Sequence, residues 1–468
     1  MVLRLLIKNE WKMLAGSAVL KWLTGSVLIF WLVALGISLN EYQYESQMRA
    51  FYKKQQRQTW VEQTPKNPHM AAHYGTFVFK PANPLSLLDK GISNFSGTFI
   101  YLEAHRQNDF VCSPAQNSSS FIRMGEFNIS FLLQFAIPLL IISLAAGMFS
   151  KEKQDGTLGF MTANSIGARP IFYAKSAVLL GFTAALTLAI FAGTLLVSAI
   201  FGVQWSVGHI MAIIALFLSY LLFYWCLTSL SLLVSFAVES FKSAFLISCF
   251  TCIFLFFWFP KLTANFADRL FPLPTSLVFR EAVRKEIVNG IDGHSMGKRE
   301  EAVIDSMLKK YNVDSTSKLP VNIDGILLTK SEAYSSSVYD NHFKDLQERI
   351  ARQQKLSSLL GIFDPFLLIR NISFAISRNS IYDEFAFRNE AEIYRNYYVQ
   401  ELNKNMTLHS KESEFQTYKV GSAVFGSIKD FDFSQAGIPE SIFRCLTDIL
   451  VLLSLLLFIH VLIFRTAS

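Results

Sequence analysis

Residues 127–150, FNISFLLQFAIPLLIISLAAGMFS, decide the fold of this chain, and a polar segment, KEKQDGTLGFMTANSIGARPIFYAK, follows them at 151–175. The first segment carries no charge and is long enough to cross a bilayer at about 1.5 Å per residue. The second begins with a Lys-Glu-Lys triplet and carries two further basic residues, Arg169 and Lys175. Because lysine and arginine gather on the cytoplasmic side of membrane proteins, we expect this segment to face the cytoplasm.

Composition and charge distribution indicate an integral membrane protein. Hydrophobic residues make up 51% of the 468 positions, and residues 176–238 contain no Asp, Glu, Lys or Arg. An uncharged stretch of that length fits two spans joined by a short turn. The formal net charge of +7 is explained by a basic cytoplasmic side. The sequence contains no basic run with interleaved aromatic residues of the kind that binds nucleic acid.

Six segments are predicted to span the membrane, at residues 22–40, 127–150, 172–202, 207–238, 243–260 and 442–464. For the first of them, a signal peptide cleaved near Ala34-Leu35-Gly36 is the alternative. Its apolar run is longer than the core of a usual signal peptide, so we interpret it as a retained span.

The segment before the first span, residues 1–21, is basic and amphipathic. Arg4, Lys8 and Lys12 recur at every fourth residue and share one face of a helix. Such a helix lies in the headgroup plane of a membrane. The alternative is a solvated basic N-terminus that only fixes orientation. In either case the sequence predicts cytoplasmic termini.

These predictions define the domain organisation of an all-α integral membrane protein. Two long polar insertions between spans lie outside the cytoplasm and form a mainly helical extracytoplasmic domain. The predicted units are the interfacial helix and first span (1–40), extracytoplasmic segment 1 (41–125), spans two to five with a cytoplasmic loop at 151–171 (126–260), extracytoplasmic segment 2 (261–441), and the sixth span with a cytoplasmic C-terminus (442–468).

The second extracytoplasmic segment is predicted to contain four helices, at about 276–288, 298–311, 330–360 and 383–406. Either Thr275 or Ser276 suits the start of the first, because a hydroxyl side chain can cap the free amides there. For the last helix, hydrophobic spacing predicts these buried positions: Phe385, Ile393, Tyr397 and Leu402.

No catalytic or metal-binding constellation is predicted. Cys112 has no evident partner, and Cys249 and Cys252 have redox-motif spacing inside an apolar helix, where packing is the better explanation. Among the scattered histidines only His69 and His73 show a loose metal spacing. The sequence has no P-loop lysine with its glycines, so we expect no cofactor on this chain.

Ionisable residues inside the predicted spans are few. His209, Arg444, Asp448 and His460 each lie close to one end of a span. Such groups are candidates for ion relays when they lie at membrane depth. Here their positions favour interfacial side chains, and the energy for any transport is expected to come from elsewhere.

A stripe of small residues follows the third span. Gly181, Ala185, Ala189 and Gly193 recur at four-residue intervals and therefore share one face. Small side chains let helices approach closely in lipid, where packing drives association. We expect this face to pack against another helix, including one from a second copy of the chain or from a sister chain.

The cytoplasmic loop resembles a known motif. Glu152-x-x-x-Gly156-Thr157-Leu158, with Arg169 and Lys175 after it, is similar to the loop of ABC type-2 exporter permeases. In that family the loop forms a coupling helix that docks on a separate ATPase subunit. The resemblance implies a short helix at 152–164 with its charged end exposed to that partner, although Asn164-Ser165-Ile166 lacks the family's proline. The implied coupling residues are Glu152, Lys153, Gly156, Thr157, Leu158, Arg169 and Lys175.

A second resemblance concerns the large insertion. Residues 364–387, 391–395 and Leu402-Asn403 are similar to the pattern of a bacterial permease subfamily with enlarged extracytoplasmic loops. This likeness implies a bacterial inner membrane, with the large loops in the periplasm.

Together the two resemblances imply a permease subunit of an ATP-driven exporter. ATP and Mg²⁺ would bind to the partner ATPase, and two permeases would pair around the translocation path. The alternative is a scaffold or mechanotransmission protein that transports nothing and acts through its periplasmic domain, because that domain is larger than simple export needs.

Overall fold

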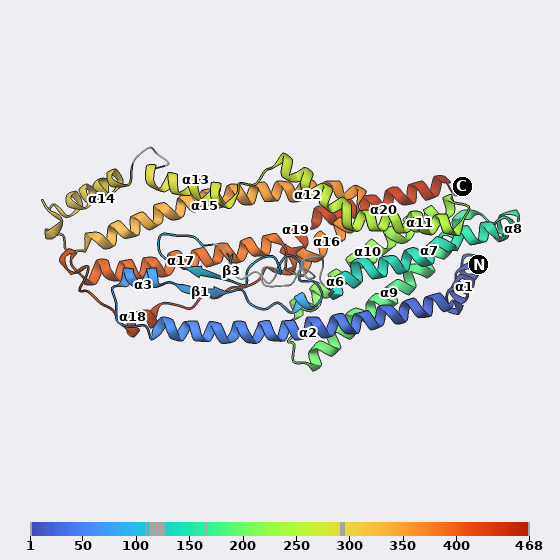
Figure 1. Cartoon of the computed structure of the whole chain (residues 1–468), viewed down its shortest axis with the longest axis horizontal. Coiled ribbons are helices and arrows are strands. Elements are labelled where there is room, and N and C mark those ends of the chain that lie inside the picture. Colours follow the sequence, from blue (N-terminus) through green and yellow to red (C-terminus); the bar gives the residue numbers. More distant parts are fainter. Residues whose placement is uncertain (1, 109, 112–126, 165, 291–294, 467–468) are drawn as a thin grey trace.

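The molecule is elongated, with a bundle of long helices at one end and a large domain at the other (Figure 1). The computed structural model describes residues 2–108, 110–111, 127–164, 166–290 and 295–466. Cys112, Ser165 and His294 lie outside the described residues. Both termini lie at the same end of the bundle, which is called the termini end below.

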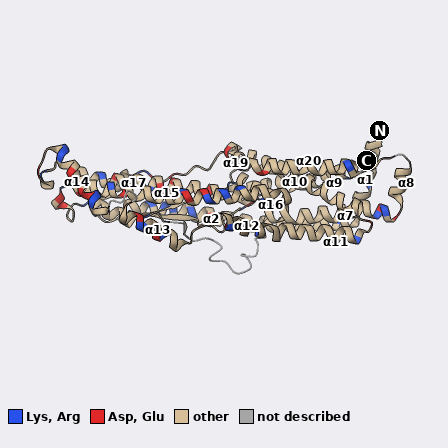
Figure 2. Cartoon of the chain, turned by 90° about the horizontal axis from the view of Figure 1, so that it is seen from above, with Lys and Arg blue, Asp and Glu red and all other residues tan. Residues whose placement is uncertain are grey.

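Six long helices form the bundle, and each is long and apolar enough to cross a membrane. The predicted fold class is confirmed. The six are α2 (Ala18–Val61), the helix Ile129–Gln154 (α6, Ile129–Phe131; η2, Leu132–Ala136; α7, Ile137–Gln154), α9 (Ala168–Ile200), α10 (Val207–Ala237), the helix Phe241–Leu270 (α11, Phe241–Ile253; η3, Phe254–Trp258; α12, Phe259–Leu270) and α20 (Leu446–Thr466). Figure 2 shows few charged residues along this bundle, with charges gathered at the termini end and over the large domain.

Two of these helices are longer than the sequence predicts. Helix α2 continues from the predicted end at residue 40 to Val61 and runs along the large domain (Figure 1). Residues 41–61 contain neither Gly nor Pro and are rich in good helix formers, so nothing ends the helix at the membrane surface. Likewise the fifth span continues past Pro260, because this proline lies in the first turn of α12, directly after the π-helical turn η3.

The large domain consists of the described residues of segments 41–125 and 261–441. The first segment contributes α3 (Pro68–Tyr74), η1 (Pro84–Leu87) and an antiparallel sheet, β1 (Thr76–Phe79), β2 (Phe99–Leu102) and β3 (Phe110–Val111), in the order β1-β2-β3. In this sheet Phe77 pairs with Tyr101. The sheet was not predicted.

The second segment contributes mostly helices: α13 (Ser276–Asn289), α14 (Met296–Tyr311), η4 (Thr316–Lys318), α15 (Ile323–Leu360), η5 (Gly361–Phe363), α16 (Pro365–Ile376), α17 (Ile381–His409), η6 (Glu412–Glu414), α18 (Ser422–Ser427) and α19 (Ile438–Arg444). All four predicted helices are present, and Thr275 caps α13 by accepting a hydrogen bond from the Val278 amide. Of the four positions predicted to be buried in α17, Leu402 is buried and Ile393 is 61% exposed.

Besides Leu402, the buried side of α17 is formed by Phe387, Ala391, Arg395 and Tyr398. The prediction for Ile393 was wrong because α17 packs against α15, α3 and β2. The side of α17 that faces these elements carries a charged arginine, and Ile393 lies on another side. Phe385 and Tyr397 are only half-buried.

Two large hydrophobic cores hold the fold together, and a small third cluster is formed by Leu14, Leu20 and Val178. The core of the large domain combines residues of both segments, for example Trp60, Ile100, Tyr398 and Phe425. The core of the bundle includes, besides the spanning helices, the whole apolar side of α16. Helix α16 packs on α10 and α20, so the second segment reaches into the end of the bundle that faces the large domain.

The N-terminal helix α1 (Val2–Gly16) packs against α9. Arg4, Lys8 and Lys12 are exposed, whereas Glu10 and Leu14 are buried. The predicted basic face is therefore present, and it is turned away from the bundle.

Candidate functional site

The termini end of the bundle carries a short helix, α8 (Thr157–Ala163), between α7 and α9 (Figure 1). This helix begins at Thr157 and not at Glu152 as predicted, because residues 152–154 continue α7. Gly156 separates the two helices with a φ of 74°. A glycine adopts this left-handed conformation without the steric penalty of other residues, so it ends α7 and redirects the chain.

Lys175 of α9 is the centre of a buried ion-pair triad. Its Nζ lies 2.6 Å from Oε1 of Glu152 in α7 and 2.6 Å from Oε1 of Glu10 in α1. The side chain of Lys175 is 1% exposed, that of Glu10 is 11% exposed and that of Glu152 is 14% exposed. Because charges of this kind are costly to bury without partners, the triad fixes the relative positions of α1, α7 and α9.

Two further predicted residues tie this region to other helices. Lys153 donates to the backbone oxygen of Phe236, 2.5 Å away, at the end of α10. Arg169 donates to the backbone oxygen of Phe464 in α20 at 2.7 Å, and its guanidinium lies 3.6 Å from the ring centre of Phe464. The charged side chains predicted to contact a partner thus make contacts within the chain.

The exposed surface of α8 is uncharged. Leu158 is buried and anchors the helix, whereas Phe160 is 73% exposed. Thr157 is exposed, and its hydroxyl donates to the backbone oxygen of Glu152 at 3.2 Å. Of the charges at the start of the predicted helix, Glu152 and Lys153 are therefore paired within the chain, whereas Asp155 is exposed.

Sequence reasoning missed Glu10 and Phe160. Glu10 is the single acidic residue in an otherwise basic amphipathic helix, and that anomaly could have identified it as paired. Phe160 had no such signal, because an aromatic residue in a short amphipathic loop is equally compatible with burial.

The predicted small-residue stripe lies on α9. Gly181, Ala185 and Ala189 are exposed, and a Cβ atom built on Gly181 would meet no described atom within 4 Å. Gly193 differs, because a Cβ atom there would lie 2.6 Å from the ring of Trp31. Beside it, Trp31 Nε1 donates to Thr194 Oγ1 at 3.0 Å. One end of the stripe thus packs on α2 and the rest faces outward.

Comparison with known families agrees with this arrangement. Residues 106–260 match the model of the ABC-2 family transporter protein, and residues 279–434 match a domain of unknown function (DUF3526). The chain carries an ABC-2 transporter membrane domain. Neither a curated protein nor a solved structure matches the chain.

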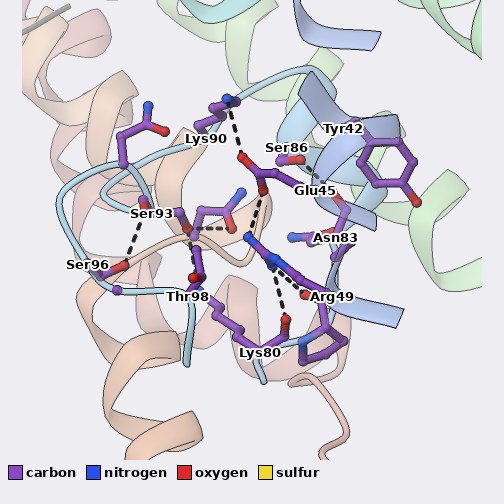
Figure 3. Close-up of a pocket in the computed structure, with 15 residues that line it drawn as sticks. Tyr42, Glu45, Arg49, Lys80, Asn83, Ser86, Lys90, Ser93, Ser96 and Thr98 are labelled. Atoms are coloured by element: carbon purple, nitrogen blue, oxygen red, sulfur yellow. Dashed lines mark hydrogen bonds and ion pairs between the residues drawn. The ribbon is translucent and has the colours of Figure 1, made fainter. Parts of the chain in front are cut away.

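The helix bundle is joined to the large domain by a cluster of charged side chains. Figure 3 shows Arg49, Glu45 and Lys90 directed toward one another in a polar pocket beside α2. Arg49 pairs with Glu45 at 2.6 Å, and Lys90 pairs with Glu41 at 2.6 Å. At the floor of the pocket, Lys80 pairs with Glu384 of α17 at 2.5 Å. The Lys90–Glu41 pair connects α2 with the first segment of the large domain, and the Lys80–Glu384 pair connects that segment with the second.

A buried hydrogen-bond network continues from this pocket into the bundle. Gln134 Nε2 donates to Asp89 Oδ2 at 3.3 Å and to the Tyr220 hydroxyl at 3.1 Å. Tyr220 in turn donates to Ser373 Oγ of α16 at 3.2 Å, and Ser373 donates to Asp89. The network joins two spans of the ABC-2 membrane domain to both segments of the large domain.

Three of the four ionisable residues near span ends have structural partners, whereas neither ring nitrogen of His460 has a hydrogen-bond partner among the described residues. His209 belongs to a capping box with Ser206 at the start of α10. Asp448 accepts from Asn371 at 2.9 Å, and Arg444 pairs with Asp383 at 2.7 Å. Among the described cysteines, Cys226, Cys249, Cys252 and Cys445 are all free thiols.

The histidines of the large domain are less scattered than the sequence indicates. His69, His73 and His105 each offer a ring nitrogen, and these three atoms lie within 4.8 Å of one another. The sequence analysis identified only the first two as a loose pair and predicted no metal ligands. His105 was missed because the unpredicted β2 strand brings it to α3.

Proposed function

We propose that this chain is the permease subunit of an ATP-driven exporter and that a separate ATPase subunit docks on α8. The observation that carries the proposal is the exposed Phe160 in the middle of α8, a helix whose surroundings are held by buried ion pairs. A large exposed aromatic side chain on an uncharged helix is a typical anchor that fills a pocket of a partner protein.

The contacts behind α8 suit the transmission of a displacement. Glu152 and Lys175 connect the two helices that flank α8 to one another and, through Glu10, to α1. Lys153 connects the end of α7 with α10, and Arg169 connects the start of α9 with α20. A push on α8 would therefore move several spans together, because buried charges resist separation.

The energy source in this proposal lies outside the chain. The sequence has no P-loop lysine, so ATP and Mg²⁺ would bind to the ATPase subunit, and this chain would act in transport and not as an enzyme. Closure of an ATPase pair around ATP would displace α8 and switch the path between two states of access. Dissociation after hydrolysis would reverse the displacement.

Two permease chains would form the translocation path. The outward-facing Gly181, Ala185 and Ala189 permit close approach of a helix from a second copy or a sister permease. In this arrangement α8 and both termini lie in the cytoplasm of a bacterial cell, and the large domain lies in the periplasm beyond the inner membrane. The basic face of α1 agrees with a cytoplasmic position, because anionic lipids attract it.

The test compares two exposed phenylalanines. The chain is purified from its native host in a mild detergent, and the co-purified ATPase and its activity are measured. Phe160→Ala is expected to reduce the bound ATPase at least about tenfold, as loss of an aromatic anchor does. Phe95→Ala, which removes an equally exposed ring (66%) from the large domain, serves as the control. Equal ATPase recovery with both variants, or a chain that purifies without any ATPase, would refute the proposal.

A scaffold that moves a periplasmic partner without transport is the rival function. The match to the ABC-2 transporter family favours a permease, because that family is defined by transport. Transport of a substrate by reconstituted vesicles, dependent on ATP, would separate the two.

A further inference from the structure

Three histidine rings converge on one point in the large domain. His69 and His73 lie one helical turn apart in α3, and His105 lies in the turn after β2. His69 Nε2 is 3.1 Å from His73 Nε2 and 3.3 Å from His105 Nε2. His69 is buried, His105 is partly exposed and His73 is exposed, so the cluster is accessible from one side.

The backbone around the cluster is held in place by side chains. Asn67 accepts a hydrogen bond from the His69 amide at 2.8 Å and so fixes the start of α3. Glu332 of α15 accepts from the backbone amide of His105 at 2.6 Å. That bond supports a left-handed conformation with a φ of 63°, which is sterically unfavourable for a non-glycine residue. His105 is thus presented to the other two rings at some expense in backbone strain.

The same carboxylate sets the tautomer of His105. Its Oε1 lies 2.5 Å from His105 Nδ1, which must donate the hydrogen, so Nε2 directs its lone pair toward the cluster. A carboxylate that orients a histidine in this way is the usual outer partner of a metal-bound imidazole. Glu332 is itself positioned by Arg395, whose Nη1 lies 3.1 Å away, and Arg395 also pairs with Glu392 at 2.7 Å.

Hydrogen bonding alone explains the contacts among the rings only as a three-centre bond, in which one hydrogen on His69 Nε2 is shared between two acceptors. His69 Nε2 takes part in both short contacts, yet a single ring nitrogen offers either one hydrogen or one lone pair. A cation that accepts all three lone pairs would satisfy the arrangement. In a tetrahedral site with Zn–N bonds of 2.0–2.1 Å, neighbouring nitrogens are roughly 3.3–3.4 Å apart, close to the two measured distances.

The electrostatic environment permits a cation. Burial, followed by the nearby His105 and His73, lowers the pKa of His69 to about 4, so the ring is neutral at physiological pH. Around the three rings lie the carboxylates of Glu332 and Glu392 and the guanidinium of Arg395. Glu103 acts on His73 as a further negative charge.

We propose that His69, His73 and His105 bind one divalent first-row transition-metal ion, for which Zn²⁺ is the best match in geometry and ligand type. Three imidazole ligands leave one of four positions to water or to an external donor atom, which is the pattern of open zinc sites and not of closed structural ones. The site belongs to the large domain, at the opposite end of the molecule from α8 (Figure 1), and does not depend on the proposed ATPase partner.

The test is metal binding by the full chain. The chain is purified in detergent without a polyhistidine tag, stripped with a chelator and then supplied with Zn²⁺ or Co²⁺. Bound Zn²⁺ is counted by mass spectrometry of the metal, and Co²⁺ is used as a spectroscopic probe of the coordination number. The expected result is one Zn²⁺ per chain and the intense visible absorption of four-coordinate Co²⁺. Loss of Zn²⁺ on chelation should also lower the melting temperature.

Three variants locate the ion. His73→Gln alters an exposed ligand with little risk to folding and is expected to weaken binding at least about a hundredfold. Glu332→Gln keeps all three ligands and is expected to weaken it about 10–100-fold, as the loss of an outer carboxylate partner does. His409→Gln changes an exposed histidine of α17 outside the cluster and should leave the affinity unchanged.

Absence of stoichiometric Zn²⁺ from the wild-type chain would overturn the proposal, whatever the variants do. So would equal losses of affinity in His73→Gln and His409→Gln, because binding would then be dispersed over surface histidines.

Discussion

Lys175 shows how one side chain determines the geometry of the termini end. It lies between two glutamates, at 2.6 Å from each, and is almost wholly buried. Without it Glu10 and Glu152 would face one another with no counter-charge. An uncompensated buried charge is far more costly than the pair itself is stabilising.

Lys175→Met is therefore expected to lower the stability of the purified chain by about 3–5 kcal/mol, the usual result of breaking a buried ion pair. The triple variant Glu10→Gln, Glu152→Gln and Lys175→Met removes all three charges and should regain most of that loss. Thermal unfolding in detergent measures both. A Lys175→Met chain with the same melting temperature as the wild type would contradict the stabilising role of the triad.

The carboxyl group of Asp364 makes the free energy of unfolding depend on pH. Its carboxylate is buried at the start of α16 and accepts a hydrogen bond from the Phe366 amide at 2.9 Å. Burial raises the pKa of Asp364 to about 7, against the opposing effect of the backbone amides of Phe366 and Leu367 and of Arg370. In the unfolded chain an aspartate has a pKa of about 3.9.

The folded chain therefore keeps a proton that the unfolded chain loses, so the contribution of Asp364 to stability falls as the pH rises from about 4 to about 7 and is constant above that. Asp364→Asn still caps α16 and should remove this loss. Relative to wild type, it is expected to gain stability between about pH 5 and about pH 8, by at most about 3–4 kcal/mol. Thermal unfolding across this range measures it, with the exposed Asp314→Asn as a control. Parallel curves for wild type and Asp364→Asn would contradict the assignment.

What the sequence can reveal about single residues is their type, and not their partners. The pattern from Glu152 to Leu158 predicted a short helix between two spans, where α8 lies, and it placed the charges toward a partner protein. Their actual partners, Glu10, Phe236 and Phe464, are distant in the sequence and are brought near only by the packing of α1, α10 and α20. His105 was missed for the same reason.

At the scale of elements, prediction succeeded where composition changes sharply and failed where it does not. All six spans and four helices of the second segment were predicted, because long apolar runs and capped amphipathic stretches are local signals. The short strands β1 to β3 have no such signal. Helix α16 also escaped notice, since its 12 residues are too few to span a membrane and its one arginine lies in an apolar stretch.

The stripe on α9 provides a test within one helix. Gly193→Leu is expected to cost about 1–3 kcal/mol, because the new side chain would overlap the ring of Trp31. Gly181→Leu meets no described neighbour and should leave the melting temperature unchanged. If Gly181 faces a second permease, the same substitution should lower the dimer fraction measured by light scattering in detergent. A Gly181→Leu chain with an unaltered dimer fraction would remove the stripe from the pairing surface.

At the scale of the whole molecule, the two hydrophobic cores are linked through the helix α2, which belongs to both. Trp60, near its far end, is 3% exposed, and its Nε1 donates to the Phe425 backbone oxygen at 3.1 Å. Its ring lies 5.5 Å from that of Tyr398. The core of the large domain is therefore built around the end of a membrane span.

Trp60→Ala is expected to destabilise the large domain by about 3–5 kcal/mol, as the loss of a buried tryptophan does. Hydrogen exchange followed by mass spectrometry should show faster exchange in α3 and α17 and unchanged exchange in α7 and α10. Trp22→Ala, which removes a side chain that is 79% exposed, is the control. Uniform acceleration throughout the chain would mean that the two cores do not unfold separately.

The unbroken course of α2 has a mechanical consequence. Its 44 residues make a rod of about 66 Å. A rod held among the spans at one end works as a lever, and a tilt of about 5° at its base would sweep its tip by roughly 6 Å. Because the tip is fastened to the large domain through Trp60 and through Arg57, which pairs with Asp430 at 3.0 Å, a small rotation within the bilayer would become a large swing beyond it.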